Sequence, residues 1–320
     1  MVPGVTHLGR FGTLGVLIFF FISGFVICRG LMEEQLAATA VSLKAFYVRR
    51  ALRILPPLML YLGVLVILGP LTGLISITLP QISKAGLFLG NLPFSGGVGW
   101  FGGHTWSLAY EEQFYLFFPL LFVVFSLTSH ARILLLLLAV MVLASLGLRP
   151  AGDVWASGYL SNMIFLLTGC AAALYQKTLL PFCGTLSFIN WLALLTLLIL
   201  FVGLLPFPLD GYVTTVIYPP LIALLVLSTP LSHPKVNSFF QNQRIAYLGK
   251  ISYTVYLWQQ LALANYPTLS PWWTVFFVVC VWVFAHYSYQ YFERPIMGVA
   301  AKWSETIKRS KLVTQSAAVC

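Results

Sequence analysis

The chain has 320 residues, of which 59% are apolar and only 8% are charged, and its formal net charge is +10. A soluble domain carries roughly 25% charged residues, so this composition excludes a soluble globular enzyme. It also excludes a disordered chain, which would need low hydrophobicity. Because the basic residues lie between long apolar runs, their charge predicts cationic loops at a membrane surface and no nucleic-acid partner.

The apolar runs predict an all-α, polytopic transmembrane helical bundle. A helix needs about 20 mostly apolar residues to cross a bilayer. Nine stretches meet or approach this length, and they cover residues 11–28, 54–76, 107–127, 133–148, 157–176, 185–205, 212–231, 250–267 and 272–292. One integral membrane domain is expected over residues 1–296, and a basic cytoplasmic tail over residues 297–320. The first run lacks the basic start and the cleavage site of a signal peptide, so we expect it to be retained.

The distribution of basic residues predicts the orientation of the bundle. If the first span runs from outside to inside, 15 of the 18 Lys and Arg residues face the cytoplasm. This asymmetry predicts a multi-pass protein of the plasma (inner) membrane with a cytoplasmic C-terminus. The same count places the N-terminus outside, which leads us to expect a missing span before it.

Two arginines interrupt the apolar pattern ahead of the Pro56–Pro57 pair. Arg50 and Arg53 are three residues apart, so they would share one face of a helix. Arginines in this arrangement can bind phosphate oxygens in bidentate fashion. An ordinary anchor at the cytoplasmic membrane surface explains the same charges, and both interpretations stay open.

Two adjacent carboxylates, Glu111 and Glu112, stand at the start of another apolar run. Ionisable residues within spans mark functional sites, although charges at a helix N-terminus are also favoured by the helix dipole. Successive helical side chains diverge by about 100°, so at most one of the two carboxylates can contact a given site. His7, ahead of the first run, is either a solvated side chain or a general base, since imidazole titrates near neutral pH.

The cysteines and histidines do not form closely spaced sets. The sequence therefore suggests neither a disulfide framework nor a metal site. The segment 249–260 contains Tyr and Trp residues that would suit an aromatic belt at the membrane surface. Its two glutamines, Gln259 and Gln260, are less easily explained within a span.

Five motifs in this order resemble the acyltransferase-3 family of integral membrane O-acyltransferases. The family pattern begins with a histidine in the first span, at the position of His7. It continues with G-V-x-x-F-F-x-x-S-G-F-x-I, R-x-x-R before Pro-Pro, W-S-L-x-x-E-x-Q-F-Y-x-x-x-P, S-Y-x-x-Y-L-W and E-R-P, which match residues 15–27, 50–57, 106–119, 252–258 and 293–295.

This resemblance implies an acyltransferase that transfers groups other than amino-acyl groups. It would move an acyl group, with acetyl expected, from acyl-CoA to a hydroxyl of a cell-surface or exported carbohydrate or glycolipid. Acyl-CoA would be a co-substrate, and no cofactor would be bound permanently. The family has ten spans, so the chain is expected to lack most of the first helix. A transporter or flippase of a lipid-linked saccharide and a truncated, inactive acyltransferase are the alternatives.

The resemblance also assigns roles to residues of this chain. His7 and Glu111 would be catalytic, with His7 deprotonating the acceptor hydroxyl and Glu111 orienting His7 or stabilising its imidazolium. Arg50 and Arg53 would bind the phosphates of CoA. The residues that could line a sugar site are Trp106, Tyr115 and Trp258.

Overall fold

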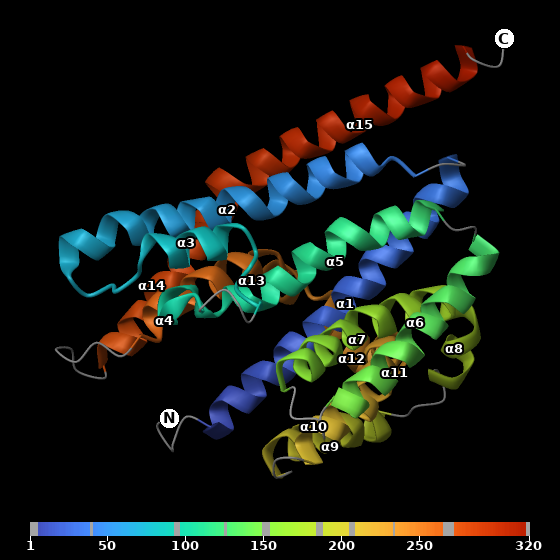
Figure 1. Ribbon diagram of the computed structural model, residues 1–320, viewed down its shortest axis with the longest axis horizontal. Helices are drawn as coiled ribbons and strands as arrows, with labels where there is room; N and C mark the ends of the chain where they lie inside the picture. The colour runs from blue at the N-terminus through green and yellow to red at the C-terminus, as the bar shows by residue number, and fades with distance from the viewer. Residues whose placement is uncertain are drawn as a thin grey trace. The chain divides into compact units, whose positions relative to one another are not determined.

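The computed structural model in Figure 1 is mainly helical in the residues that it describes. These residues are 6–38, 41–92, 97–124, 127–148, 154–183, 188–204, 209–232, 234–264 and 272–317. They contain no strand, so the predicted all-α fold class is confirmed. The chain divides into two compact units, Met1–Val41 with Gln113–Asn242 and Ser42–Glu112 with Gln243–Cys320.

The first unit, which contains the N-terminus, is built on the long helix α1 (Thr6–Ala38). Its other elements are the second part of α5 (Thr105–Val124), α6 (Leu127–Leu148), α7 (Val154–Leu174), α8 (Gln176–Cys183), α9 (Phe188–Leu204), α10 (Leu209–Val216), α11 (Tyr218–Ser232) and α12 (Pro234–Gln241). Helix α1 packs mainly against α7. The contact is close because Gly24 lies against the backbone of Leu166, and Gly169 lies against the backbone of Phe21. Small residues allow helix backbones to approach in this way, as is common in membrane proteins.

The second unit is built on α2 (Leu43–Thr72), along which α15 (Arg294–Ala317) runs (Figure 1). Its other elements are α3 (Leu79–Gly86), α4 (Gly99–Gly103), the first part of α5, α13 (Gln243–Ala262), α14 (Trp272–Ser288) and the π-helix η2 (Tyr289–Glu293). Helix α13 contacts α2, α4, α14 and η2. This arrangement brings segments far apart in the sequence to the neighbourhood of the first turns of α5.

The ends of α2 follow from local sequence signals. The Ser42 hydroxyl accepts a hydrogen bond from the backbone N–H of Ala45, which satisfies one of the free donors at the helix start. At the other end, Gly73 adopts a left-handed conformation (φ 65°) and donates its N–H to the carbonyl of Gly69 at 3.0 Å. A glycine reaches this conformation without the penalty of a Cβ atom, so the helix ends there.

Several helices have the length and composition of membrane spans. Within the described residues, three qualify by these criteria: Gly12–Ala37, Leu43–Thr72 and Trp272–Lys308. A fourth is added if Gly158–Leu174 and Gln176–Cys183, which are bent by 90°, form one broken span. Large apolar side chains remain exposed along α14, among them Trp272, Val275, Phe276 and Val279. These features suit a helical bundle in a membrane, while the number of nine spans stays a prediction.

Candidate active site

Three buried polar side chains lie in a row at the start of α5. His104 connects α4 to α5 with helical backbone angles, φ −66° and ψ −18°. Ser107 and Glu111 follow three and seven residues later, so the three side chains share one helical face. The exposed fractions of His104, Ser107 and Glu111 are 7%, 4% and 4%. Because polar groups buried this deeply cost free energy unless they have partners, the row is a candidate for chemistry.

Tyr256 of α13 contacts this row. Its hydroxyl donates a hydrogen bond to the backbone carbonyl of His104 at 2.6 Å, and it lies 2.6 Å from the hydroxyl of Ser107. It also interacts electrostatically with Glu111. One phenol therefore connects all three positions of the row to α13.

Aromatic rings from α2 and α13 surround the imidazole of His104. The rings of Tyr61 and Tyr256 each pack edge-on against it, with centroids 5.4 Å away. The Tyr61 hydroxyl donates to the carbonyl of Phe101 at 2.6 Å, which fixes that ring in place. Trp258 packs against Tyr61 in turn, with 5.5 Å between ring centroids. The imidazole is therefore held in a defined orientation.

Charged residues gather around a second tyrosine of α13, Tyr253. Its hydroxyl donates to the carbonyl of Ile54 at 2.8 Å. Three carboxylates and one guanidinium act electrostatically on this hydroxyl, namely those of Glu111, Glu112, Glu293 and Arg53. The Glu111 carboxylate and the Arg53 guanidinium of the R-x-x-R motif therefore belong to one neighbourhood within this unit.

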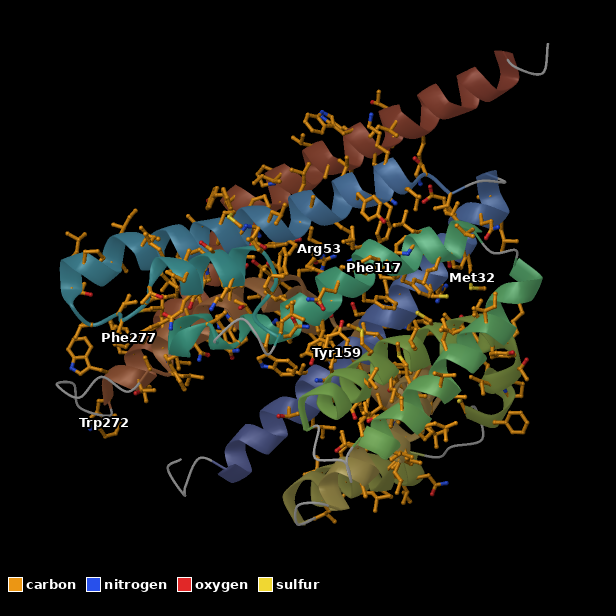
Figure 2. The ribbon with its side chains drawn as sticks, viewed as in Figure 1. Met32, Arg53, Phe117, Tyr159, Trp272 and Phe277 are labelled. Carbon is orange, nitrogen blue, oxygen red and sulfur yellow. The ribbon has the colours of Figure 1, made fainter. Side chains whose placement is uncertain are left out.

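The two arginines of the R-x-x-R motif interact with different carboxylates. Arg50 interacts electrostatically with Glu112, and Arg53 (Figure 2) interacts with Glu293. The Arg53 side chain is exposed and that of Arg50 is half-buried. Both guanidinium groups are thus held near carboxylates while remaining accessible to a further anion.

Glu293 belongs to the E-R-P motif, and the π-helix η2 carries it. Its carboxylate accepts hydrogen bonds from the hydroxyls of Thr254 and Ser288, the latter at 3.0 Å. The side chain is only 6% exposed. Single π-turns inside α-helices occur frequently at functional sites. This turn brings a carboxylate to the arginine end of the site.

Arg49 differs from its neighbours because it connects two helices. Its guanidinium donates a hydrogen bond to the hydroxyl of Ser304, which lies on α15. We therefore assign Arg49 to the packing of α15 on α2, and leave Arg50 and Arg53 as the candidates for a ligand.

The predicted aromatic residues divide between the two units. Trp258 lies beside Tyr61 of the His104 surroundings, and Trp106 packs edge-on against Tyr110, with 5.8 Å between ring centroids. Tyr115 belongs to the first unit, where its hydroxyl bonds with that of Ser23 on α1.

His7 lies in the first turns of α1, and its side chain is outside the part of the structure that is described. It belongs to a different unit from Glu111. The pairing of His7 with Glu111 therefore stays a prediction.

His104 was not singled out by the sequence. A lone histidine after two glycines carries no signal by itself, and its position matters only once α4 and α5 join without a break in helical angles. The sequence signal that could have identified His104 was its spacing of seven residues from Glu111, which places both residues on one face of a helix.

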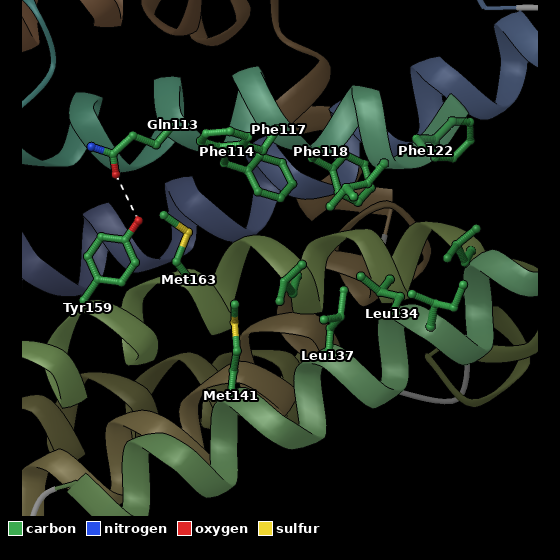
Figure 3. A pocket seen from close by; sticks show the side chains of 14 residues that line it. Gln113, Phe114, Phe117, Phe118, Phe122, Leu134, Leu137, Met141, Tyr159 and Met163 are labelled. Atoms are coloured by element: carbon green, nitrogen blue, oxygen red, sulfur yellow. Dashed lines mark hydrogen bonds between the residues drawn. The ribbon is translucent and has the colours of Figure 1, made fainter. Parts of the chain in front are cut away.

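The first unit contains a cavity of about 400 Å³ between the second part of α5 and helices α6 and α7 (Figure 3). Its walls are almost wholly apolar, and the residues that line them include Phe114, Phe117, Phe118, Leu134, Leu137, Met141 and Met163. At one end Tyr159 donates a hydrogen bond to the side-chain carbonyl of Gln113 at 3.0 Å. Such walls suit hydrocarbon and not phosphate or sugar, so the polar cluster of the second unit is the stronger candidate for the chemistry.

The fold and the cluster describe a helical membrane protein in which carboxylates gather near two accessible arginines. The chain belongs to the acyltransferase-3 family, because the model of that family's acyltransferase domain matches residues 2–289. Family and apolar helices together indicate an integral membrane protein. No solved structure matches the chain.

Curated relatives are similar to the chain over 89% of its length. The peptidoglycan O-acetyltransferase OatA of Listeria monocytogenes is 26% identical, and the alignment covers 51% of that protein. The putative O-acetyltransferase SACOL0978 of Staphylococcus aureus is 28% identical, with 52% of it covered. The putative peptidoglycan O-acetyltransferase YrhL of Bacillus subtilis is 29% identical, with 50% covered. The chain thus spans about half the length of the curated relatives that it matches.

Proposed function

We propose that the chain transfers an acetyl group from acetyl-CoA to a hydroxyl of a cell-wall carbohydrate, with peptidoglycan as the acceptor. Membership of an acyltransferase family and the names of the relatives support the class of reaction and of acceptor. The observation that carries the proposal is the common neighbourhood of the Glu111 carboxylate and the Arg53 guanidinium around Tyr253.

The proposed reaction exchanges a thioester for an oxygen ester. The acceptor oxygen attacks the acetyl carbonyl, a C–O bond forms and the C–S bond of the donor breaks. The proton of the acceptor hydroxyl passes to a base, for which we propose His7, and then to the departing CoA thiolate, which leaves as the thiol. Glu111 stabilises the positive charge that develops during this transfer, as a carboxylate beside a base commonly does.

The arginines are proposed to hold the donor. Guanidinium groups bind phosphate oxygens with two parallel hydrogen bonds, and Arg50 and Arg53 lie three residues apart on α2. Trp106, Tyr115 and Trp258 are proposed to contact the sugar. We place the protein in the plasma membrane with several spans and a cytoplasmic C-terminus, so that CoA reaches the arginines from the cytoplasm.

Ester-linked acetate in the cell wall tests this function. Expression of the chain in a bacterium that lacks its own peptidoglycan O-acetylation is expected to add acetate that mild alkali releases from purified walls. A strain that expresses the Glu111→Gln variant at equal level is the control. Walls without added acetate, in cells that contain the folded chain, would contradict the proposal. Movement of lipid-linked saccharide without any acetyl transfer would favour a transporter.

Replacement of Arg53 by Gln tests the donor site. We expect the KM for acetyl-CoA to rise by about ten- to a hundredfold, because charge-assisted hydrogen bonds to phosphate would be lost. Initial rates in membranes at varied acetyl-CoA measure this effect. Arg29→Gln is the matched control, since Arg29 is exposed and pairs with Glu33 at 2.7 Å. An unchanged KM in the Arg53 variant would remove Arg53 from the donor site.

A further inference from the structure

The imidazole of His104 is buried without a hydrogen-bond partner on either ring nitrogen among the residues that the structure describes. Only 7% of the residue is exposed. The backbone of Leu257 lies near the ring but outside hydrogen-bond geometry. A buried polar atom without a partner costs free energy, so a histidine at this position calls for an explanation.

Packing does not supply that explanation. The contacts of the ring are edge-on contacts with Tyr61 and Tyr256, which a phenyl ring would make equally well. Tyr256 bonds to the backbone carbonyl of His104 and not to its side chain. The two nitrogens therefore add nothing to the fold that phenylalanine would lack.

The ring is uncharged near neutral pH. Burial lowers the pKa of His104 to about 4. The backbone of Leu257 has a smaller effect, which raises the pKa. A neutral imidazole has one N–H donor and one nitrogen with a free lone pair. Whichever ring nitrogen carries the hydrogen, the other one remains as an acceptor.

We propose that His104 is a further ligand-contacting residue of the site, whose ring nitrogen accepts a hydrogen bond from a hydroxyl of the carbohydrate acceptor. This inference rests on the proposed function and names a residue that binds the same substrate class. Its support is geometric, since His104 shares a helical face with Ser107 and Glu111. His104 would thus hold the acceptor hydroxyl on the same helical face as the Glu111 carboxylate. The proton of that hydroxyl would pass to another group during the reaction.

A pair of substitutions separates this role from a structural one. His104→Phe keeps the contacts with Tyr61 and Tyr256 and removes both nitrogens. We expect its melting temperature to equal or exceed that of the wild type, while acetyl transfer per folded molecule falls about ten- to a hundredfold. His104→Gln, which restores a hydrogen-bonding group, should regain part of the loss with the pH profile of the wild type above pH 5. The control is His286→Phe on α14, where an exposed imidazole bonds to Tyr247 at 2.9 Å.

The outcomes are distinct. Full activity in His104→Phe would overturn the proposal. A lower melting temperature with unchanged activity per folded molecule would also overturn it, because it would point to a structural water bound to the ring. A disaccharide fragment of peptidoglycan should raise the melting temperature of the wild type and not that of His104→Phe. This binding measurement does not need acetyl transfer. If the wild type transfers no acetate, the proposed function fails, and equal stabilisation of both proteins by the fragment would separately disprove the role of His104.

Discussion

Replacement of Glu111 by Gln is expected to lower acetyl transfer by at least about a hundredfold while the chain stays folded. The substitution removes the negative charge and leaves the shape of the side chain almost unchanged. Glu111 is 4% exposed and acts electrostatically on the hydroxyls of Tyr253 and Tyr256, so its charge is felt throughout the site. A carboxylate that is screened only weakly by water has a large effect on any charge that develops beside it.

The measurement for Glu111→Gln is the rate of acetyl transfer in membranes, normalised to folded protein. Glu305→Gln on α15 is the matched control, because its carboxylate is exposed and belongs to the same unit. We expect the Glu111 variant to lose kcat, with the KM for acetyl-CoA nearly unchanged, since the arginines remain. Wild-type kcat in the folded Glu111 variant would disprove a catalytic role for this carboxylate.

Substitution of Gly24 by Leu is expected to prevent the first unit from folding. A Cβ atom at Gly24 would overlap the backbone carbonyl of Leu166, and a Cβ at Gly169 would overlap that of Phe21. Because backbone cannot move aside as a side chain can, α1 and α7 would have to separate. The helices would also lose the contact in which the Cys170 thiol donates to the carbonyl of Gly24 at 3.3 Å. We expect a destabilisation of about 3 kcal/mol or more.

The yield of monodisperse protein in detergent and its melting temperature measure this effect. Gly15→Leu is the control on the same helix, where nothing lies within 4 Å of an added Cβ. The control should behave like the wild type, because its new side chain points into open space. Equal melting temperatures for the two variants would contradict the close packing of α1 on α7.

The all-α fold class was predictable because few folds other than a helical membrane bundle suit long apolar runs separated by basic loops. The C-terminal end of the first helix was not predictable. The apolar run stops at Cys28, yet α1 continues to Ala38, where polar residues such as the Arg29–Glu33 pair support helical turns beyond the run. Hydropathy detects the part of a helix that avoids water, and α1 continues past that part.

The site was predictable in its charged members and not in its full arrangement. Arg50, Arg53 and Glu111 stood out because ionisable residues are rare in this chain. Glu293 belonged to a matched motif, but its place near Arg53 depends on η2 and on hydroxyls from α13 and α14. His104 required the junction of α4 and α5. Contacts between residues as far apart in the sequence as Arg53 and Glu293 leave no local pattern in a single sequence.

The π-helix η2 makes this part of the chain sensitive to length and not only to composition. A π-turn holds one residue more than an α-turn, so Glu293 lies on the face of Ser288 although five residues separate the two. In a regular α-helix of unchanged length, the same separation would turn Glu293 by about 140° from Ser288, and its carboxylate would leave the hydroxyls of Thr254 and Ser288. A deletion of one residue within Tyr289–Phe292 would reduce the separation to four residues, at which α-helical side chains share a face again. The arginine end of the site therefore depends on the match between the number of residues after Ser288 and the kind of helical turn that they form.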